Sequence, residues 1–328
     1  LVAACEAAGV KRFVQISAPG AEAGARTAFL STKAAGDAAV RGSKLDWTIL
    51  KPGLVISAGA YGATALLRML AAAPVVQPIA LADASVQTVA GSDVGEAVRA
   101  VLAGEVASRR DYELVEDEVH TLEGMLKAVR RWVGRDDALA VWRLPRWMAF
   151  GVGSFADIGG RMGWRSPLRT TALRSLADGV TGDAGPWREA GGFQLKSLEE
   201  TLRALPSTMQ ERVFGRTQLV FPVLLLILSA FWLASGVIGI VQRGQAEAVI
   251  AARVGSDVAT WLVVSGIVLD LAIGWGLLWR KWTRRAAWGS VLVSLGYLAA
   301  GTVVTPELWA DPLGPFVKVF PAIALGLA

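Results

Sequence analysis

The sequence has 328 residues, of which 53% are hydrophobic and 19% charged, and its mean hydropathy is +0.46. This composition is too apolar for a wholly water-soluble protein of this length, which suits two domains. The net charge of +5 includes no basic patch in residues 1–215, which argues against nucleic acid as a partner. The single cysteine, Cys5, excludes an internal disulfide, and with one histidine, His120, we expect no metal site.

Both ends of the chain are unusual. There is no initiator methionine, and residues 1–8 already place apolar side chains on one helical face. The last residues, PAIALGLA, stop inside an apolar run. We therefore expect an internal fragment, truncated at the N-terminus, whose first strand leaves one edge of its sheet open.

The first fifty residues predict a βαβ unit. Residues 12–17 (RFVQIS) form a β-rich run, and residues 27–40 have helical spacing with Thr27 or Ser31 as the cap. Residues 46–50 (DWTIL) form a second strand, which Lys51-Pro52-Gly53 ends. Such a unit has parallel strands and a right-handed crossover. Residues 93–102 predict another helix and residues 111–115 another strand, and residues 121–210 are mainly helical. We expect one soluble domain over residues 1–210.

The stretch AAGVKRFVQISAPGAE, followed by AFLSTKAAGDAAVRGSKLDWTILKPG, resembles the atypical and extended short-chain dehydrogenase/reductases. Within this superfamily, the sequence pattern is most similar to that of NmrA-like proteins and of proteins akin to the 39-kDa accessory subunit of respiratory complex I. In these families a strand ends in serine, a Tyr-x-x-x-Lys motif follows on a helix, and the next strand ends in a Pro-Gly turn. Ser17 matches the serine, Lys33 the lysine, and Pro52 and Gly53 the turn, whereas Phe29 stands at the tyrosine position.

The resemblance implies an incomplete Rossmann-type parallel sheet that binds NAD or NADP through Ser17, Lys33, Pro52 and Gly53. Ser17 and Lys33 are also the catalytic candidates. Phe29 has no transferable proton, so the usual carbonyl-reductase mechanism is in doubt. Lys33 also has a purely structural interpretation, as a surface residue paired with Asp37 four residues on.

The glycine-rich phosphate-binding turn of this fold is absent from the sequence. Residues 151–160 (GVGSFADIGG) contain Gly-x-Gly, but they follow a helix-like run instead of a strand. The acidic run Glu116-Asp117-Glu118 is a further candidate for catalysis, but we expect these side chains to be solvated charges in a loop. The aromatic residues between 142 and 155 lie among arginines; they are consistent with a pocket roof, a membrane-surface face or, as we expect, packing between helices.

Residues 216–328 contain four long apolar stretches: 217–241, 258–279, 286–306 and 312–328. The first three reach the length that spans a bilayer. The segments FWLASGVIGIV, VLDLAIGWGLLW and PELWADPLGPFVK resemble the DoxX-like family of four-helix membrane proteins. We therefore expect an all-α, antiparallel four-helix transmembrane bundle that follows the soluble domain.

The charge of the loops predicts the orientation of this bundle. Four basic residues and no acid lie between 280 and 285, whereas the next loop has only acids. Positive-inside logic then places the soluble domain and both ends of the bundle in the cytoplasm, at the inner (plasma) membrane. Two charged residues lie within the spans, Asp270 and Lys318. Asp270 should face inward, toward Ser235, Ser294 or Tyr297, as either a proton relay or a hydrogen-bonding residue.

Two functions remain open on the sequence alone. The first is a membrane-anchored NAD(P)-dependent oxidoreductase that acts on a lipophilic substrate such as a quinone or a lipid carbonyl. The second is a non-catalytic dinucleotide-binding module that senses redox state or assembles a membrane redox complex, which the loss of the tyrosine at Phe29 favours.

Overall fold

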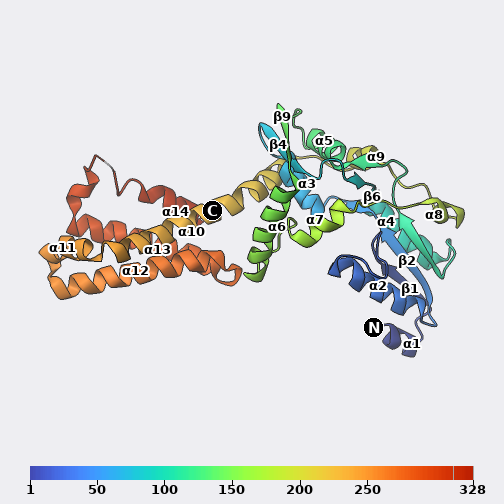
Figure 1. The fold of residues 1–328 in the computed structure, drawn as a ribbon, viewed down its shortest axis with the longest axis horizontal. Coiled ribbons are helices and arrows are strands. Elements are labelled where there is room, and N and C mark those ends of the chain that lie inside the picture. The colour runs from blue at the N-terminus through green and yellow to red at the C-terminus, as the bar shows by residue number, and fades with distance from the viewer. Residues whose placement is uncertain (313, 328) are drawn as a thin grey trace. The chain divides into compact units, whose positions relative to one another are not determined.

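The computed structural model describes residues 1–312 and 314–327, which form two compact units. Unit 1 comprises residues 1–157 and 166–219, and unit 2 comprises residues 158–165 and the described residues from Val220 onward. The α/β elements of unit 1 are labelled in Figure 1. They begin with α1 (Val2–Ala7), β1 (Arg12–Ile16), α2 (Ala28–Arg41), β2 (Asp46–Pro52), β3 (Leu54–Ile56), α3 (Ala63–Ala71), β4 (Val76–Ala80), β5 (Ser85–Val86), β6 (Thr88–Ala90) and α4 (Gly91–Ala103).

The main sheet of unit 1 has the order β1-β2-β7, with β7 at Arg110–Leu114. Both strand pairs are parallel, and Arg12 faces Asp46 in the first. Helix α2 connects β1 to β2 and begins at Thr27, whose side chain accepts a hydrogen bond from the Leu30 amide at 3.3 Å. The predicted βαβ unit is confirmed. Strand β1 has one strand neighbour among the described residues, and its two terminal residues are exposed, as expected for an open edge.

Gly53 joins β2 to β3 at a point where no side chain fits. A Cβ atom there would lie 2.6 Å from the Gln87 carbonyl oxygen and 2.9 Å from a Val115 methyl. The Gly53 amide donates to the Leu114 carbonyl, and the Leu54 amide donates to the Gln87 carbonyl. The chain thus leaves the main sheet at Gly53 and joins β6, with which β3 pairs in parallel.

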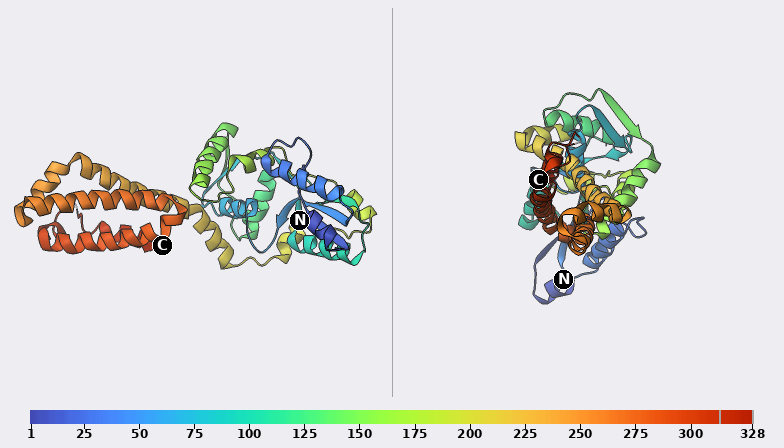
Figure 2. Two further views of the ribbon diagram at one scale, coloured as in Figure 1. Left: turned by 90° about the horizontal axis from the view of Figure 1, so that it is seen from below. Right: turned by 90° about the vertical axis from the view of Figure 1, so that its left-hand side faces the viewer.

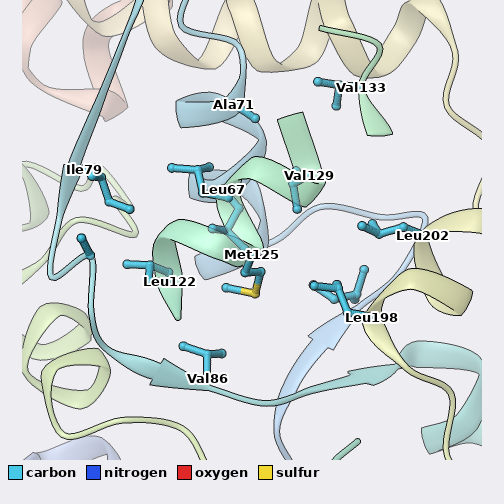
Figure 3. Close-up of a cluster of buried hydrophobic side chains, with 13 residues drawn as sticks. Leu67, Ala71, Ile79, Val86, Leu122, Met125, Val129, Val133, Leu198 and Leu202 are labelled. Carbon is cyan, nitrogen blue, oxygen red and sulfur yellow. The ribbon is translucent and has the colours of Figure 1, made fainter. Parts of the chain in front are cut away.

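The second half of unit 1 is mainly helical, as predicted. It contains β8 (His120–Thr121), α5 (Leu122–Trp132), β9 (Ala140–Leu144), α6 (Arg146–Arg161, whose last four residues belong to unit 2), α7 (Thr170–Ala177), α8 (Gly185–Glu189) and α9 (Leu198–Ala204). Strand β9 pairs in parallel with β4, and β5 pairs antiparallel with β8. Figure 3 shows the apolar core in which α3 and α5 meet, with Leu67 and Met125 near its centre.

The start of α10 (Met209–Val241) is packed into unit 1. Buried Arg68 of α3 forms an ion pair with Glu211 and donates to the Ser57 and Ala58 carbonyls at 2.7 and 3.1 Å. A Cβ at Gly215 would lie 2.8 Å from the Arg68 carbonyl oxygen, so the backbones of α3 and α10 approach closely there.

Unit 2 is helical. It contains most of α10, α11 (Arg243–Val254), α12 (Ser256–Leu278), α13 (Arg280–Val304), the 3₁₀ turn Pro306–Trp309 and α14 (Val319–Leu327). Helices α12 and α13 run side by side in Figure 1 and Figure 2 and are in extensive contact. Among the described residues, α10, α12 and α13 are long and apolar enough to cross a membrane.

The segment between the first two predicted spans is helix α11. One detail of unit 2 differs from the expectation. Among its described residues, the fourth apolar stretch contains the nine-residue α14, which packs on α13 and at about 1.5 Å per residue is too short to span a bilayer by itself. Residues 313 and 328 of that stretch lie outside the described residues.

Candidate functional site

Ser17 lies at the carboxyl end of β1 and is buried. Its amide donates to the Leu50 carbonyl of β2 at 2.7 Å, so it continues the parallel ladder. Its hydroxyl donates to Asp37 Oδ2 of α2 at 2.5 Å. The hydroxyl proton of Ser17 is therefore held by a carboxylate.

Lys33 lies on the same face of α2 and points back toward the end of β1. Its Nζ atom donates to the Ile16 carbonyl at 3.0 Å and lies 5.6 Å from the centroid of the Phe29 ring. The structural interpretation of Lys33 as the partner of Asp37 is wrong, because Asp37 is fully buried against Ser17. An ammonium has three donors, and the hydrogen bond to Ile16 uses one of them.

Pro52 is the last residue of β2, two residues beyond Leu50, which pairs with Ile16. Ser17 and Pro52 thus follow neighbouring parallel strands at the same edge of the sheet, where open α/β sheets bind ligands. Gly53 has a packing role of its own, since the Gln87 backbone excludes a side chain there.

A cavity of about 520 Å³ lies beside this edge, within unit 1. Phe29 lines it together with the apolar faces of α3 and α5 and residues of α7 and the segment before it. Most of the residues that line the cavity are apolar. Among the described lining residues, Arg169 is the one that carries a charge. Arg169 is paired with Asp157 at 3.0 Å. Hydrogen bonds from the Thr170 hydroxyl and from Arg169 lower the pKa of the Asp157 carboxyl group. The cavity therefore suits an uncharged, apolar molecule.

Sequence reasoning missed three features of this region. Asp37 is part of the Ser17 site, although its spacing from Lys33 indicated a surface ion pair. Glu116 is not a solvated loop charge: it is buried and accepts hydrogen bonds from the Thr88 amide at 2.8 Å, the Thr88 hydroxyl at 2.6 Å and the Leu198 amide at 2.6 Å. The cavity is built from distant segments, which no local pattern connects.

The residues present fit the nicotinamide-ribose part of a dinucleotide. The ammonium group of Lys33 is held at the strand ends with donors to spare, and the apolar ring of Phe29 lies beside it. Residues 151–160, with their Gly-x-Gly segment, lie inside helix α6 and do not form a phosphate-binding turn.

A polar cluster lies inside the bundle of unit 2. Asp270 is buried and accepts hydrogen bonds from Ser235 at 2.6 Å and from Tyr297 at 2.8 Å, so it joins α10, α12 and α13. This confirms the inward-facing carboxylate and two of its three expected neighbours. The third, Ser294, is buried on α13, whereas Lys318 is exposed.

Replacing Asp270 with alanine is expected to destabilise the bundle by about 1–2 kcal/mol, because two interhelical hydrogen bonds are lost. Asp270→Asn should retain most of the stability, since an amide oxygen still accepts a hydrogen bond. Thermal unfolding in lipid nanodiscs measures both, with Asp257→Ala, exposed on the same helix, as the matched control. If Asp270→Ala and Asp257→Ala unfold at the same temperature, the cluster contributes no stability.

The parallel βαβ unit is the arrangement of a Rossmann-like domain, and Ser17, Lys33 and Pro52 lie at or near the carboxyl ends of its strands. Residues 1–102 match the family model described as NAD(P)H-binding, and residues 229–327 match the DoxX-like family. The chain thus joins a segment that matches an NAD(P)H-binding domain to a segment that matches a DoxX-like domain, and its cofactor is NAD or NADP.

Several solved structures are similar to this chain. The Escherichia coli NADPH-dependent quinone oxidoreductase complexed with NADPH is 19% identical, over 62% of this chain and 68% of the other, with a TM-score of 0.46. The Citrobacter sp. triphenylmethane reductase complexed with NADP(H) is 18% identical over 62% and 67%, with a TM-score of 0.46. The UDP-glucose 4-epimerase of Thermotoga maritima is 19% identical over 67% and 68%, with a TM-score of 0.43. No curated protein sequence matches.

Proposed function

We propose that the protein is a membrane-anchored NAD(P)H-dependent reductase of a lipophilic substrate, with a quinone as the favoured substrate class. The observation that carries this proposal is the apolar cavity of about 520 Å³ that Phe29 lines beside Lys33. When bound there, a reduced nicotinamide supplies a hydride. Lys33 holds the ribose, and the walls from α3, α5 and α7 exclude water from an apolar ring.

Phe29 favours a quinone over a lipid carbonyl. Hydride addition to a carbonyl produces a strongly basic alkoxide, which needs an acid within the site. Addition to a quinone produces a phenolate-type anion, which is much less basic and takes its proton from water. Ser17 does not replace the missing phenol, because its proton is directed at Asp37.

The membrane domain supports a substrate that is dissolved in the bilayer. Among the described residues, three helices have the length and composition of membrane spans, so the reductase domain is held at the membrane, where the effective concentration of such a substrate is high. The basic segment 280–285 supports an orientation with the dinucleotide-binding domain and both bundle ends in the cytoplasm of a plasma (inner) membrane protein.

A second candidate is a dinucleotide-binding sensor or an assembly module of a membrane redox complex. Phe29 and the engaged hydroxyl of Ser17 favour it, since neither side chain offers a free proton to a substrate. The two candidates differ in turnover: the sensor binds NAD(P)H tightly and does not oxidise it.

The test is the effect of Lys33→Ala on NADPH oxidation by decylubiquinone, with the protein in lipid nanodiscs. We expect kcat/KM to fall by about 10- to 100-fold, because one charge-assisted hydrogen bond to the ribose contributes about 1.5–3 kcal/mol. Lys44→Ala, which removes an exposed lysine at the turn before β2, should leave kcat/KM unchanged.

Binding is measured in parallel through the fluorescence of the reduced nicotinamide. Wild-type protein that binds NADPH but shows no turnover with quinones of different chain length contradicts the reductase and supports the sensor. Equal kcat/KM values for Lys33→Ala and Lys44→Ala contradict the role given to Lys33.

A further inference from the structure

Helix α6 has a free apolar face. Trp147, Phe155 and Ile158 lie along one side of it, at positions i, i+8 and i+11, and their exposed fractions are 74%, 77% and 49%. Gly151 continues the same stripe. The expected packing of these aromatic residues between helices is wrong. They do not line the cavity of unit 1 either, so the interpretation as a pocket roof has no support.

The opposite face of α6 is packed against protein. Ala149 and Gly153 are buried there, and a Cβ at Gly153 would lie 2.9 Å from a methyl of Leu173, a residue that lines the cavity. Asp157 accepts hydrogen bonds from Arg169 at 3.0 Å and from Thr170 at 2.6 Å. Because this face is fixed by packing and hydrogen bonds, the helix cannot turn its aromatic stripe inward.

The carboxyl end of α6 and the turn after it are attached to the ends of the candidate spans. The Trp164 indole donates to the carbonyl of Leu278, the last residue of α12, at 2.7 Å. The amide of Arg280, the first residue of α13, donates to the Met162 carbonyl at 3.1 Å. The ring of Trp164 also lies 6.4 Å from that of Phe221 in α10. Residues 158–165 thus lie where three spans begin or end.

Basic residues surround this border. Arg146 and Arg161 flank the apolar stripe of α6, and Arg165 follows it; all three are exposed. Four further cations, with no acid, lie between residues 280 and 285, at the start of the adjoining helix α13. Tryptophan rings and arginines around an apolar helix face are typical of helices that lie at the headgroup level of an anionic bilayer.

We propose that α6 lies in the membrane interface, with Trp147, Phe155 and Ile158 inserted among the lipids and its arginines in contact with anionic headgroups. The partner of this face is the bilayer itself. The attachment of residues 158–165 to the span ends places the last turn of α6, residues 158–161, at the level of the headgroups. The fixed inner face then directs the aromatic stripe outward. This inference goes beyond the proposed reductase activity, and its test requires no turnover.

The experiment measures how deeply α6 enters the bilayer. Cys5→Ser removes the only native thiol, so that Phe155→Cys or Trp147→Cys carries a single environment-sensitive nitrobenzoxadiazole label. The protein is placed in nanodiscs of phosphatidylcholine and phosphatidylglycerol, with and without brominated acyl chains. The control is Glu199→Cys, whose side chain is 84% exposed on α9.

Bromine is expected to quench most of the emission at both α6 positions and little of it at position 199. Since the Trp147 and Phe155 side chains are largely exposed, their replacement should not affect folding, and the two positions test the same face independently. Quenching at 147 and 155 that does not exceed that at 199 overturns the proposal. Nanodiscs without phosphatidylglycerol lack anionic headgroups, so the quenching at positions 147 and 155 should be weaker in them. Equal quenching with and without phosphatidylglycerol contradicts the role given to the arginines.

Discussion

Phe29→Tyr is expected to raise the NADPH-dependent carbonyl-reductase activity of the protein. The new phenol would lie on the face of α2 where the Lys33 ammonium is 5.6 Å from the present ring centroid. A cation at this range favours the ionised phenol and so lowers its pKa, which makes it a better proton donor near neutral pH. General-acid catalysis contributes about 10²–10⁴-fold, and we expect NADPH-dependent reduction of a long-chain aldehyde to rise by this factor.

The control for this gain is Phe29→Leu, which changes the ring without adding a proton donor. Neither variant should alter the affinity for NADPH by more than about threefold, since Lys33 remains in place. The gained activity should fall as the pH rises above the pKa of the phenol, because only its protonated form donates. An aldehyde-reduction rate that is the same in Phe29→Tyr and Phe29→Leu, with NADPH still bound, would show that the tyrosine is not the missing part.

Trp187→Ala is expected to destabilise unit 1 more than any other substitution considered for this protein. The indole is fully buried; its N–H donates to the Phe193 carbonyl at 2.9 Å, and its ring meets those of Tyr112 and Phe193 edge-on at 5.6 Å. Loss of a buried tryptophan costs about 3–5 kcal/mol. The first thermal transition in nanodiscs should therefore fall by roughly 6–20 °C for a unit of this size.

The matched control is Trp142→Ala, because Trp142 is 56% exposed on β9. Its transition should remain within about 2 °C of that of the wild type, as expected for a surface substitution. Equal transitions in the two variants would mean that the aromatic cluster around Trp187 does not hold unit 1 together. Hydrogen exchange of peptides from β7 and α8 assigns the transition to this unit.

Local patterns predicted the elements that local physics determines. Residues 12–17 and 46–50 were predicted as strands, and they form β1 and β2, because a short apolar run between turn residues favours an extended conformation. Thr27 was predicted as a helix cap, and its side chain accepts a hydrogen bond at the start of α2. The pairing of Ser17 and Lys33 with the strand ends followed from the βαβ unit and the resemblance. Asp270 faced inward because a mid-span carboxylate has no other stable position.

The remaining features depend on contacts between distant segments. Asp37 has the spacing of a surface ion pair with Lys33, yet the end of β1 covers it and offers the Ser17 hydroxyl instead. Glu116 looks like one of three loop acids until β6 and α9 bring three donors to it. The free face of α6 depends in the same way on the segment around Leu173, which packs against Gly153.

The close approach of α3 and α10 limits how this protein can be divided. A soluble version that ends at residue 205 would lose Glu211 and leave the guanidinium of Arg68 buried without its counter-charge, a situation that costs about 3–5 kcal/mol. Leu66, Leu67 and Leu70 of the same helix line the cavity, so the damage would reach the ligand site. The two halves are therefore not interchangeable modules. A graft onto another membrane anchor has to retain residues 209–219, the turns of α10 that belong to unit 1.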